Sequence, residues 1–181
     1  MENMEQQLAD VKAQLDTLRT GQPENKLAMV VFSGDLDRAL AALIIATGAV
    51  AMGMEAVLFF TFWGTPVLRD KNKSVSGKDT MGKMFGTMLP KGADALKLSK
   101  MNMGGMGTMM MKTLMKQKNV ASLADMLALA EELEVRIIIC EMSMDLMGFK
   151  REEMINYKHL EYGGVAKFIA EAGTSKIQLF I

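Results

Sequence analysis

Short apolar runs alternate with helix-like patterns along most of the chain. Runs rich in β-branched and aromatic residues occupy 27–32, 56–62, 135–139 and 177–181, as in strands that are buried on both faces. Apolar positions at helical spacing cover 36–52, 123–134 and 165–172, and a more polar helix is expected around 150–157. Strand, helix and strand in this order form a βαβ unit. We therefore expect an α/β domain with a doubly wound, mainly parallel sheet of about four or five strands.

The N-terminal segment has a different pattern. An apolar stripe at alternating spacings of four and three lies on an otherwise polar helix and consists of Met4, Leu8, Val11, Leu15 and Leu18. A helix this short is marginal alone, so its stripe is expected to pack on the body of the protein or, as we favour, on other copies of the chain. Residues 1–22 are thus interpreted as an amphipathic helix with a linker, and 26–181 as the α/β domain.

Residues 70–118 form an insert that interrupts the βα alternation. Two helices are expected here, near 79–88 and 107–117, separated by Pro90 and Gly92. The insert is rich in methionine: Met81, Met84, Met88, Met101, Met103, Met106, Met109, Met110, Met111 and Met115. Long inserts in compact domains are often lids or binding surfaces, and methionine forms adaptable surfaces.

Several interpretations of the insert remain open. The methionines can be core and oligomer interface, or they can form a lid or partner surface. Their thioethers suit Cu(I), although the insert holds neither histidine nor cysteine to complete such a site. Lysines that accompany the apolar residues also allow contact with a membrane surface.

The composition limits the partners and the cellular location that we expect for the protein. Acidic and basic side chains balance at 21 each, so no strong field draws the protein to nucleic acid. The N-terminus lacks the apolar stretch of a secretory signal, and no run reaches the ~18 apolar residues of a membrane span. We therefore expect a cytoplasmic protein without a membrane span or a nucleic-acid partner.

Cysteine and histidine each occur once. A single cysteine excludes an intrachain disulfide and a zinc cluster built on thiolates. A single histidine argues against a His-rich metal site or a Ser-His-Asp triad, and His159, beside Lys158 on a polar stretch, is expected to be exposed. We expect neither a metal nor a cofactor.

The candidate for chemistry is Cys140, the residue that ends the buried run 135–139. Glu141, Ser143 and Asp145 follow it and indicate the start of a helix. Ligands of open α/β sheets bind outside the carboxyl ends of the strands, and amide groups at a helix start favour a thiolate. The alternative is that Cys140 is a small buried hydrophobe. Glu141 and Asp145 oppose thiolate formation if they face the sulfur.

Other candidate site residues follow neighbouring strands. Because the carboxyl ends of parallel strands meet at one edge, we expect a pocket lined by Ser33, Gly34, Asp35, Trp63, Gly64, Glu141, Met142 and Ser143. Asp35 or Ser33 is also expected to cap the helix 36–52. A phosphate can bind at such a helix start, but a lone glycine lacks the glycine-rich fingerprint of a dinucleotide site, so we discount a nucleotide.

Several sequence blocks, in order, carry a family resemblance. KLAMVVFSGDLDRALAALIIATGAVAMG, TFWG, KLSKMNMGGMGT, CEMSMDLMG and EYGGVAKF together resemble the DsrE/DsrF/DsrH-like family, in particular its DsrE-like sulfur-trafficking branch, which includes relatives described as peroxiredoxins. The resemblance extends from about residue 26 to residue 181 and leaves out the N-terminal helix.

The resemblance implies a flavodoxin-like domain that forms homo-oligomers. It further implies that Cys140 accepts sulfane sulfur as a persulfide and passes it to a partner thiol, for example on a rhodanese-like or TusA-like protein. Some relatives carry a second cysteine; this chain has none, so its relay must use one thiol. Whether transfer is enzymatic or stoichiometric stays open. The alternative is a non-catalytic oligomeric binding module that uses the Met-rich insert as its partner or ligand surface.

Overall fold

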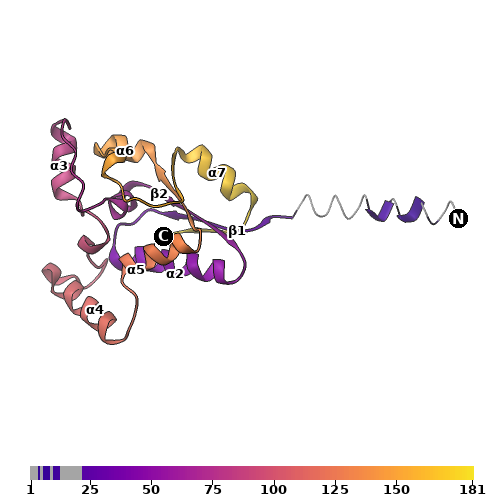
Figure 1. The fold of residues 1–181 in the computed structure, drawn as a ribbon, viewed down its shortest axis with the longest axis horizontal. Coiled ribbons are helices and arrows are strands. Elements are labelled where there is room, and N and C mark those ends of the chain that lie inside the picture. Colours follow the sequence, from indigo (N-terminus) through magenta and orange to yellow (C-terminus); the bar gives the residue numbers. More distant parts are fainter. Residues whose placement is uncertain (1–3, 5, 9, 13–21) are drawn as a thin grey trace.

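A five-stranded sheet forms the centre of the computed structural model, which describes residues 4, 6–8, 10–12 and 22–181 (Figure 1). The strands lie in the order β4-β3-β2-β1-β5, and every neighbouring pair is parallel. Their bounds are β1 Glu24–Val31, β2 Glu55–Phe60, β3 Arg136–Cys140, β4 Leu160–Gly163 and β5 Ser175–Phe180. The predicted α/β fold class is confirmed.

Helices cover both faces of this sheet. The helices α2 (Leu36–Ala51) and α5 (Leu123–Glu132) lie on one face, and α7 (Val165–Thr174) lies on the other (Figure 1). The remaining helices are α3 (Thr80–Met88), α4 (Met106–Gln117) and α6 (Glu141–Met147), with 3-10 turns η1 (Phe62–Leu68), η2 (Ala93–Ala95), η3 (Met103–Gly105) and η4 (Arg151–Glu153). The predicted helices near 79–88 and 107–117 therefore correspond to α3 and α4.

Side-chain alternation divides the core into two layers. Successive residues of a strand point to opposite faces, so Ile137 and Ile139 of β3 pack towards α2 and α5. Ile138 and Cys140 point the other way and join the smaller cluster around Phe168 of α7. The larger layer holds most of the buried apolar residues, whereas a single helix covers the second.

The N-terminal stripe is described only in part. Residues 4, 6–8 and 10–12 are helical, and Met4, Leu8 and Val11 are exposed. Leu15 and Leu18 lie outside the described residues. The oligomer contact expected for this stripe therefore stays a prediction.

The region around 150–160 departs from expectation. The prediction of a helix at 150–157 is wrong, because within this range only Arg151–Glu153 is helical, as a 3-10 turn. The following backbone instead pairs with another segment, because the amide of Ile155 donates to the carbonyl of Leu68 (2.8 Å) and Met154 forms an antiparallel bridge with Arg69. The strand β4, which the sequence pattern did not predict, then follows.

His159 also departs from expectation, since its side chain is half-buried rather than exposed. Its ring lies edge-on to Tyr157, with the ring centroids 6.5 Å apart. Its carbonyl accepts a hydrogen bond from the amide of Ile137 (3.0 Å), which places this residue beside the start of β3.

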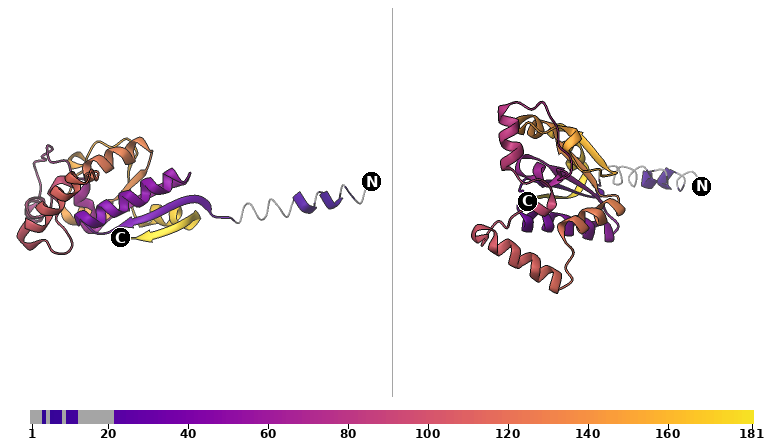
Figure 2. Two further views of the ribbon diagram at one scale, coloured as in Figure 1. Left: turned by 90° about the horizontal axis from the view of Figure 1, so that it is seen from below. Right: turned by 60° about the vertical axis from the view of Figure 1, so that its left-hand side comes forward.

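The methionines of the insert lie at the surface. All ten are exposed except Met115, which is half-buried, so the interpretation that places them in the core of this chain is wrong. Figures 1 and 2 show α4 standing away from the sheet and its covering helices. The interface, lid, partner-surface, Cu(I) and membrane-surface interpretations stay open.

Candidate functional site

Cys140 occupies the position that the sequence predicts, at the carboxyl end of an interior strand. It is the last residue of β3, and α6 begins at the next residue. The chain turns into the helix through Cys140 itself, whose backbone is extended (φ −69°, ψ 110°). This thiol is the only one in the chain.

The thiol does not face the open edge of the sheet. Cys140 is 2% exposed and belongs to the apolar layer that contains Phe59, Ile138 and Phe168. The cause is the period of the strand, which places Cys140 on the same face as Ile138 and therefore beneath α7. Reaction at the sulfur requires that some covering group move.

The turns after β1 and β2 meet backbone to backbone. A Cβ built on Gly34 would lie 2.2 Å from the carbonyl oxygen of Trp63, and one on Gly64 would lie 2.2 Å from that of Val31. Only glycine permits this approach. The structure thus brings the two predicted turns together, but their own backbones fill the space between them.

Ser33 and Asp35 bond to each other. The Ser33 hydroxyl donates to Oδ2 of Asp35 (2.7 Å), and the amide of Asp35 donates back to that hydroxyl (3.3 Å). Asp35 is the N-cap residue of α2, as expected, but its side chain makes no capping hydrogen bond. Trp63, at the facing turn, is exposed.

Ser143 does not line an open pocket; its buried side chain forms hydrogen bonds to the turn that follows β2. It is fully buried, its hydroxyl lies 2.9 Å from that of Thr61, and it accepts a hydrogen bond of 2.9 Å from the amide of Phe62. Phe62 has a positive φ of 44°, which is unusual for a bulky residue. Ser143 therefore holds the first turn of α6 against the turn that follows β2.

Glu141 and Met142 point away from the apolar layer. Glu141 forms an ion pair with Arg151, and Met142 is exposed. A surface cavity of about 480 Å³ adjoins this side of α6 and is lined by Glu141, Met144, Asp145, Phe149, Lys150, Arg151 and Glu152. The carboxylate of Glu141 is thus neutralised by a neighbour.

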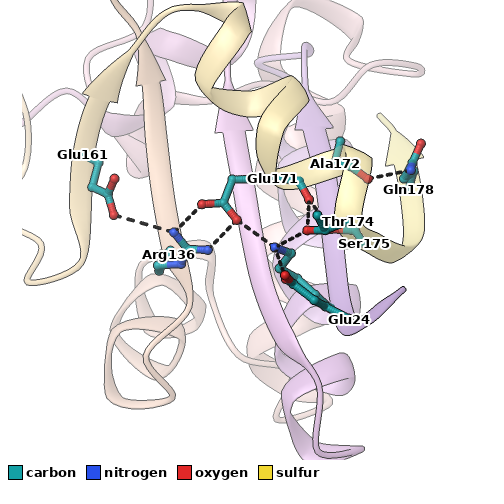
Figure 3. A network of polar contacts seen from close by, with 9 residues as sticks. Glu24, Arg136, Glu161, Glu171, Ala172, Thr174, Ser175 and Gln178 are labelled. Atoms are coloured by element: carbon teal, nitrogen blue, oxygen red, sulfur yellow. Dashed lines mark hydrogen bonds and ion pairs between the residues drawn. The ribbon is translucent and has the colours of Figure 1, made fainter. Parts of the chain in front are cut away.

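The helix that covers Cys140 is held at two places. Phe168 stacks on Phe59 of β2, with the ring centroids 5.1 Å apart. Towards the end of α7, Glu171 accepts two hydrogen bonds of 2.7 Å from Arg136 and one of 2.9 Å from Lys26 (Figure 3). The bonds from Arg136, partly opposed by burial and assisted by Lys26, lower the pKa of Glu171 to about 2.

Sequence reasoning did not identify the residues that lie beside the thiol or that cover the neighbouring strand. Phe168 and Lys167 belong to α7, and Gly163 ends the unpredicted strand β4. Their positions relative to Cys140 depend on the strand order and on the face that α7 covers, and no motif signals either. The helix expected over 165–172 corresponds to α7, but the sequence did not indicate which face of the sheet it covers.

The described part of the chain contains neither a cluster of metal ligands nor a helix that could cross a membrane. There, no group of three or more His, Cys, Asp or Glu side chains is arranged to hold a metal ion. Across the same residues, no helix has both the length and the apolar character that crossing a membrane requires.

Comparisons with known proteins place this arrangement in a family. Residues 23–180 match the model of the "DsrE/DsrF/DrsH-like family". The chain is 43% identical over 156 residues to "Uncharacterized protein YrkE" of Bacillus subtilis (86% of this chain, 96% of that protein). It is 38% identical over 159 residues to "Sulfur carrier protein DsrE2" of Allochromatium vinosum (87% and 99%).

A solved structure was matched as well. The ychN protein of E. coli aligns with a TM-score of 0.49 and 10% identity, covering 86% of this chain and 98% of that one. The family match extends over nearly the whole α/β domain and includes the β3–α6 junction with Cys140. The chain therefore belongs to the DsrE/DsrF/DrsH-like family.

Proposed function

We propose that this protein is a sulfur carrier that holds sulfane sulfur as a persulfide on Cys140 and relays it to a thiol of a partner protein. The observation that carries the proposal is the position of the single thiol, at the carboxyl end of β3 and directly before α6, in a chain 38% identical to a protein named as a sulfur carrier. Sulfur transfer needs one nucleophilic thiol and no cofactor.

The transfer balances without an oxidant. The Cys140 thiolate attacks the outer sulfur of a donor persulfide, so a sulfur–sulfur bond forms at Cys140 while the donor's own sulfur–sulfur bond breaks. The donor leaves as a thiolate and takes up the proton that Cys140 released. The reverse exchange, with the thiolate of an acceptor attacking the outer sulfur on Cys140, discharges the carrier.

Burial of the thiol suits a carrier that must keep its cargo between two exchanges. A persulfide beneath α7 is shielded from water and from unrelated thiols, in the way that a closed active site prevents side reactions. The same burial requires an opening step at loading and at discharge.

We also propose that the protein works as a homo-oligomer in the cytoplasm and exchanges sulfur with rhodanese-like or TusA-like partners. Exposed apolar side chains support a protein contact: the edge strand β5 presents Ile177, Leu179 and Phe180. The Met-rich surface of α3 and α4 is a second candidate contact.

A second function is favoured by two observations. Cys140 is buried and the methionines of the insert are exposed, which fits a non-catalytic binding module that grips a partner through α3 and α4. Reactivity of the folded protein decides between the two functions.

The deciding experiment is loading with inorganic polysulfide, followed by intact-mass spectrometry under native and denaturing conditions. A carrier gains one sulfane sulfur on the folded chain, and Cys140→Ser gains none. As a control, the unsubstituted protein is unfolded in urea before it is exposed to polysulfide. This control shows whether the Cys140 thiol can react when burial no longer protects it. A folded chain that stays unmodified while the unfolded chain reacts would instead support the binding module.

A further inference from the structure

One neighbour of Cys140 has no side chain of its own. In the pairing of β3 with β4, Cys140 lies opposite Gly163. Paired residues of parallel strands point to the same face, and neighbouring strands lie ~4.8 Å apart, so the position above Gly163 adjoins the thiol beneath α7.

The aliphatic stem of Lys167 fills that position. A Cβ built on Gly163 would lie 2.7 Å from Cδ of Lys167 and 3.3 Å from its Cβ. The ammonium group continues along β4 and forms an ion pair of 2.5 Å with Glu161, two residues before Gly163. Lys167 thus lies over the outer end of β4, above the residue that pairs with Cys140.

We propose that Lys167 is the movable cover of Cys140 and, once released from Glu161, the counter-ion of the thiolate and of the persulfide. This inference rests on the proposed function of Cys140 and names the residue that opens and serves its site. Glu161 is the latch, and Gly163 provides the space in which the cover lies.

Mobility distinguishes Lys167 from the other groups around the thiol. Phe168 is fixed by stacking on Phe59, and the strands on either side are fixed by the hydrogen bonds of the sheet. The side chains of Lys167 and Glu161 are 40% and 36% exposed, and an ion pair this open contributes little to stability. Swinging Lys167 outward breaks one screened contact and no backbone bond.

Charge gives the same residue a second role. An anionic sulfur in an apolar layer is costly unless a cation or a hydrogen-bond donor accompanies it. The charged groups further along this face, towards the amino ends of the strands, pair among themselves: Glu171 accepts from Arg136 and Lys26, and Arg136 also lies 3.9 Å from Glu161. The flexible stem of Lys167 lets its ammonium turn from Glu161 to the sulfur.

The first test measures the rate at which neutral iodoacetamide alkylates Cys140 in the folded protein. Glu161→Gln, which removes the latch, should accelerate labelling about two- to fivefold, the change in population that one exposed ion pair produces. Lys167→Ala, which removes the cover, should accelerate it about tenfold or more. Lys167→Arg keeps both stem and charge and should label at nearly the native rate.

Controls separate local opening from unfolding. Lys176→Ala removes an exposed lysine of β5 and should leave the rate unchanged. Unfolding midpoints in urea identify any variant whose labelling reflects lost stability. If Lys167→Ala and Glu161→Gln label at the native rate while dilute urea accelerates all variants alike, the thiol is reached by unfolding and the inference is overturned.

The second test concerns charge. The ratio of labelling rates for anionic iodoacetate and neutral iodoacetamide reports a cation near the sulfur. The ratio of the iodoacetate rate to the iodoacetamide rate should be about twofold or more lower in Lys167→Met than in the native protein. In Lys167→Arg the ratio should equal that of the native protein. A native protein that shows these dependences but takes no sulfur from polysulfide would support the cover and reject the carrier function. An unchanged ratio in Lys167→Met would overturn the counter-ion role.

Discussion

The guanidinium of Arg136 donates two hydrogen bonds of 2.7 Å to the carboxylate of Glu171 and thereby joins the first residue of β3 to the last turns of α7. Cys140 ends the strand that Arg136 begins, and α7 is the helix that covers it. The pair thus fixes α7 at one end of β3 and leaves the other end, with the thiol, to Phe168 and Lys167.

Stability should depend on pH through Glu171. Its pKa is lowered from 4.5 to about 2 by the bonds from Arg136, so its contribution is complete above about pH 4.5 and is lost as the pH falls towards 2. Glu171→Gln should lower the free energy of unfolding at neutral pH by about 1–2 kcal/mol, a value reduced for solvent screening of this half-buried pair.

Urea unfolding of both proteins between neutral pH and about pH 3 checks this expectation. The difference between native protein and Glu171→Gln should shrink as the pH falls, because a protonated Glu171 resembles glutamine. The exposed Glu132, replaced by glutamine, serves as control. A difference of constant size across the range would show that the carboxylate charge does not hold α7.

The insert is attached by a buried charge network. Glu153 pairs with Arg69 (3.4 Å) and with Lys78, and Arg69 donates to the carbonyls of Gly86, Leu89 and Pro90 at the end of α3. Despite desolvation, which acts in the opposite direction, the bonds from Lys78 and the amide of Lys150 lower the pKa of Glu153.

Removing the charge of Glu153 should therefore destabilise the insert. Glu153→Gln leaves Arg69 and Lys78 buried without their counter-charge, which costs about 3–5 kcal/mol in comparable pairs. Denaturant unfolding measures the loss, and limited proteolysis should show earlier cleavage within 80–88. The adjacent, exposed Glu152, changed to glutamine, should have little effect. Equal stability of both variants would contradict a structural role for the network.

Two glycines set the distance between α3 and α6. A Cβ on Gly148 would lie 2.5 Å from Cα of Gly82, and Gly148 has a φ of +63°. Gly148→Ala should destabilise the protein by at least ~1–2 kcal/mol. The alanine would have to adopt a left-handed backbone conformation, and its Cβ would also clash with Gly82. Gly48→Ala, inside α2 with open space around it, should instead stabilise by ~0.5–1 kcal/mol. If the unfolding temperature falls in Gly148→Ala and rises in Gly48→Ala, the close contact is supported. Changes of the same sign in both variants would argue against it.

Ser143 should contribute to stability through its two bonds. Ser143→Ala leaves the amide of Phe62 and the hydroxyl of Thr61 without this partner, a loss of ~1–3 kcal/mol. A double-mutant cycle with Thr61→Val should give a clear coupling energy, since the two hydroxyls are in contact. The exposed Ser74, changed to alanine, provides the baseline. Additive effects of Ser143→Ala and Thr61→Val would mean that the hydroxyl contact contributes nothing.

Local patterns were sufficient to predict elements with strong terminal signals. Ser122 caps α5 as expected, since its hydroxyl accepts from the amide of Asp125 while the Asp125 carboxylate accepts from the amide of Ser122. The strand β4 was missed because four residues, Leu160–Gly163, that include a glutamate offer little pattern. Its formation depends on pairing with β3 and therefore on tertiary context.

The burial of Cys140 illustrates what local pattern does not determine. In the run 137–139 all three residues are isoleucine, so hydrophobicity cannot tell which face of β3 is covered by which helices. The location of the thiol at a strand end was predictable, and its orientation beneath α7 was not. The pairing of Gly163 with Cys140 depends on the strand order, and so does the place of Lys167 above Gly163.

The most direct test of the carrier account is discharge of labelled sulfur. Cys140 is loaded with isotopically labelled polysulfide, excess reagent is removed, and a small acceptor thiol is added while intact mass is followed. The account predicts that the label leaves Cys140 and appears, one atom for each protein chain loaded, as an alkylation-trapped persulfide of the acceptor. A label that never enters the folded protein, or that enters and is not passed to the thiol, would contradict it.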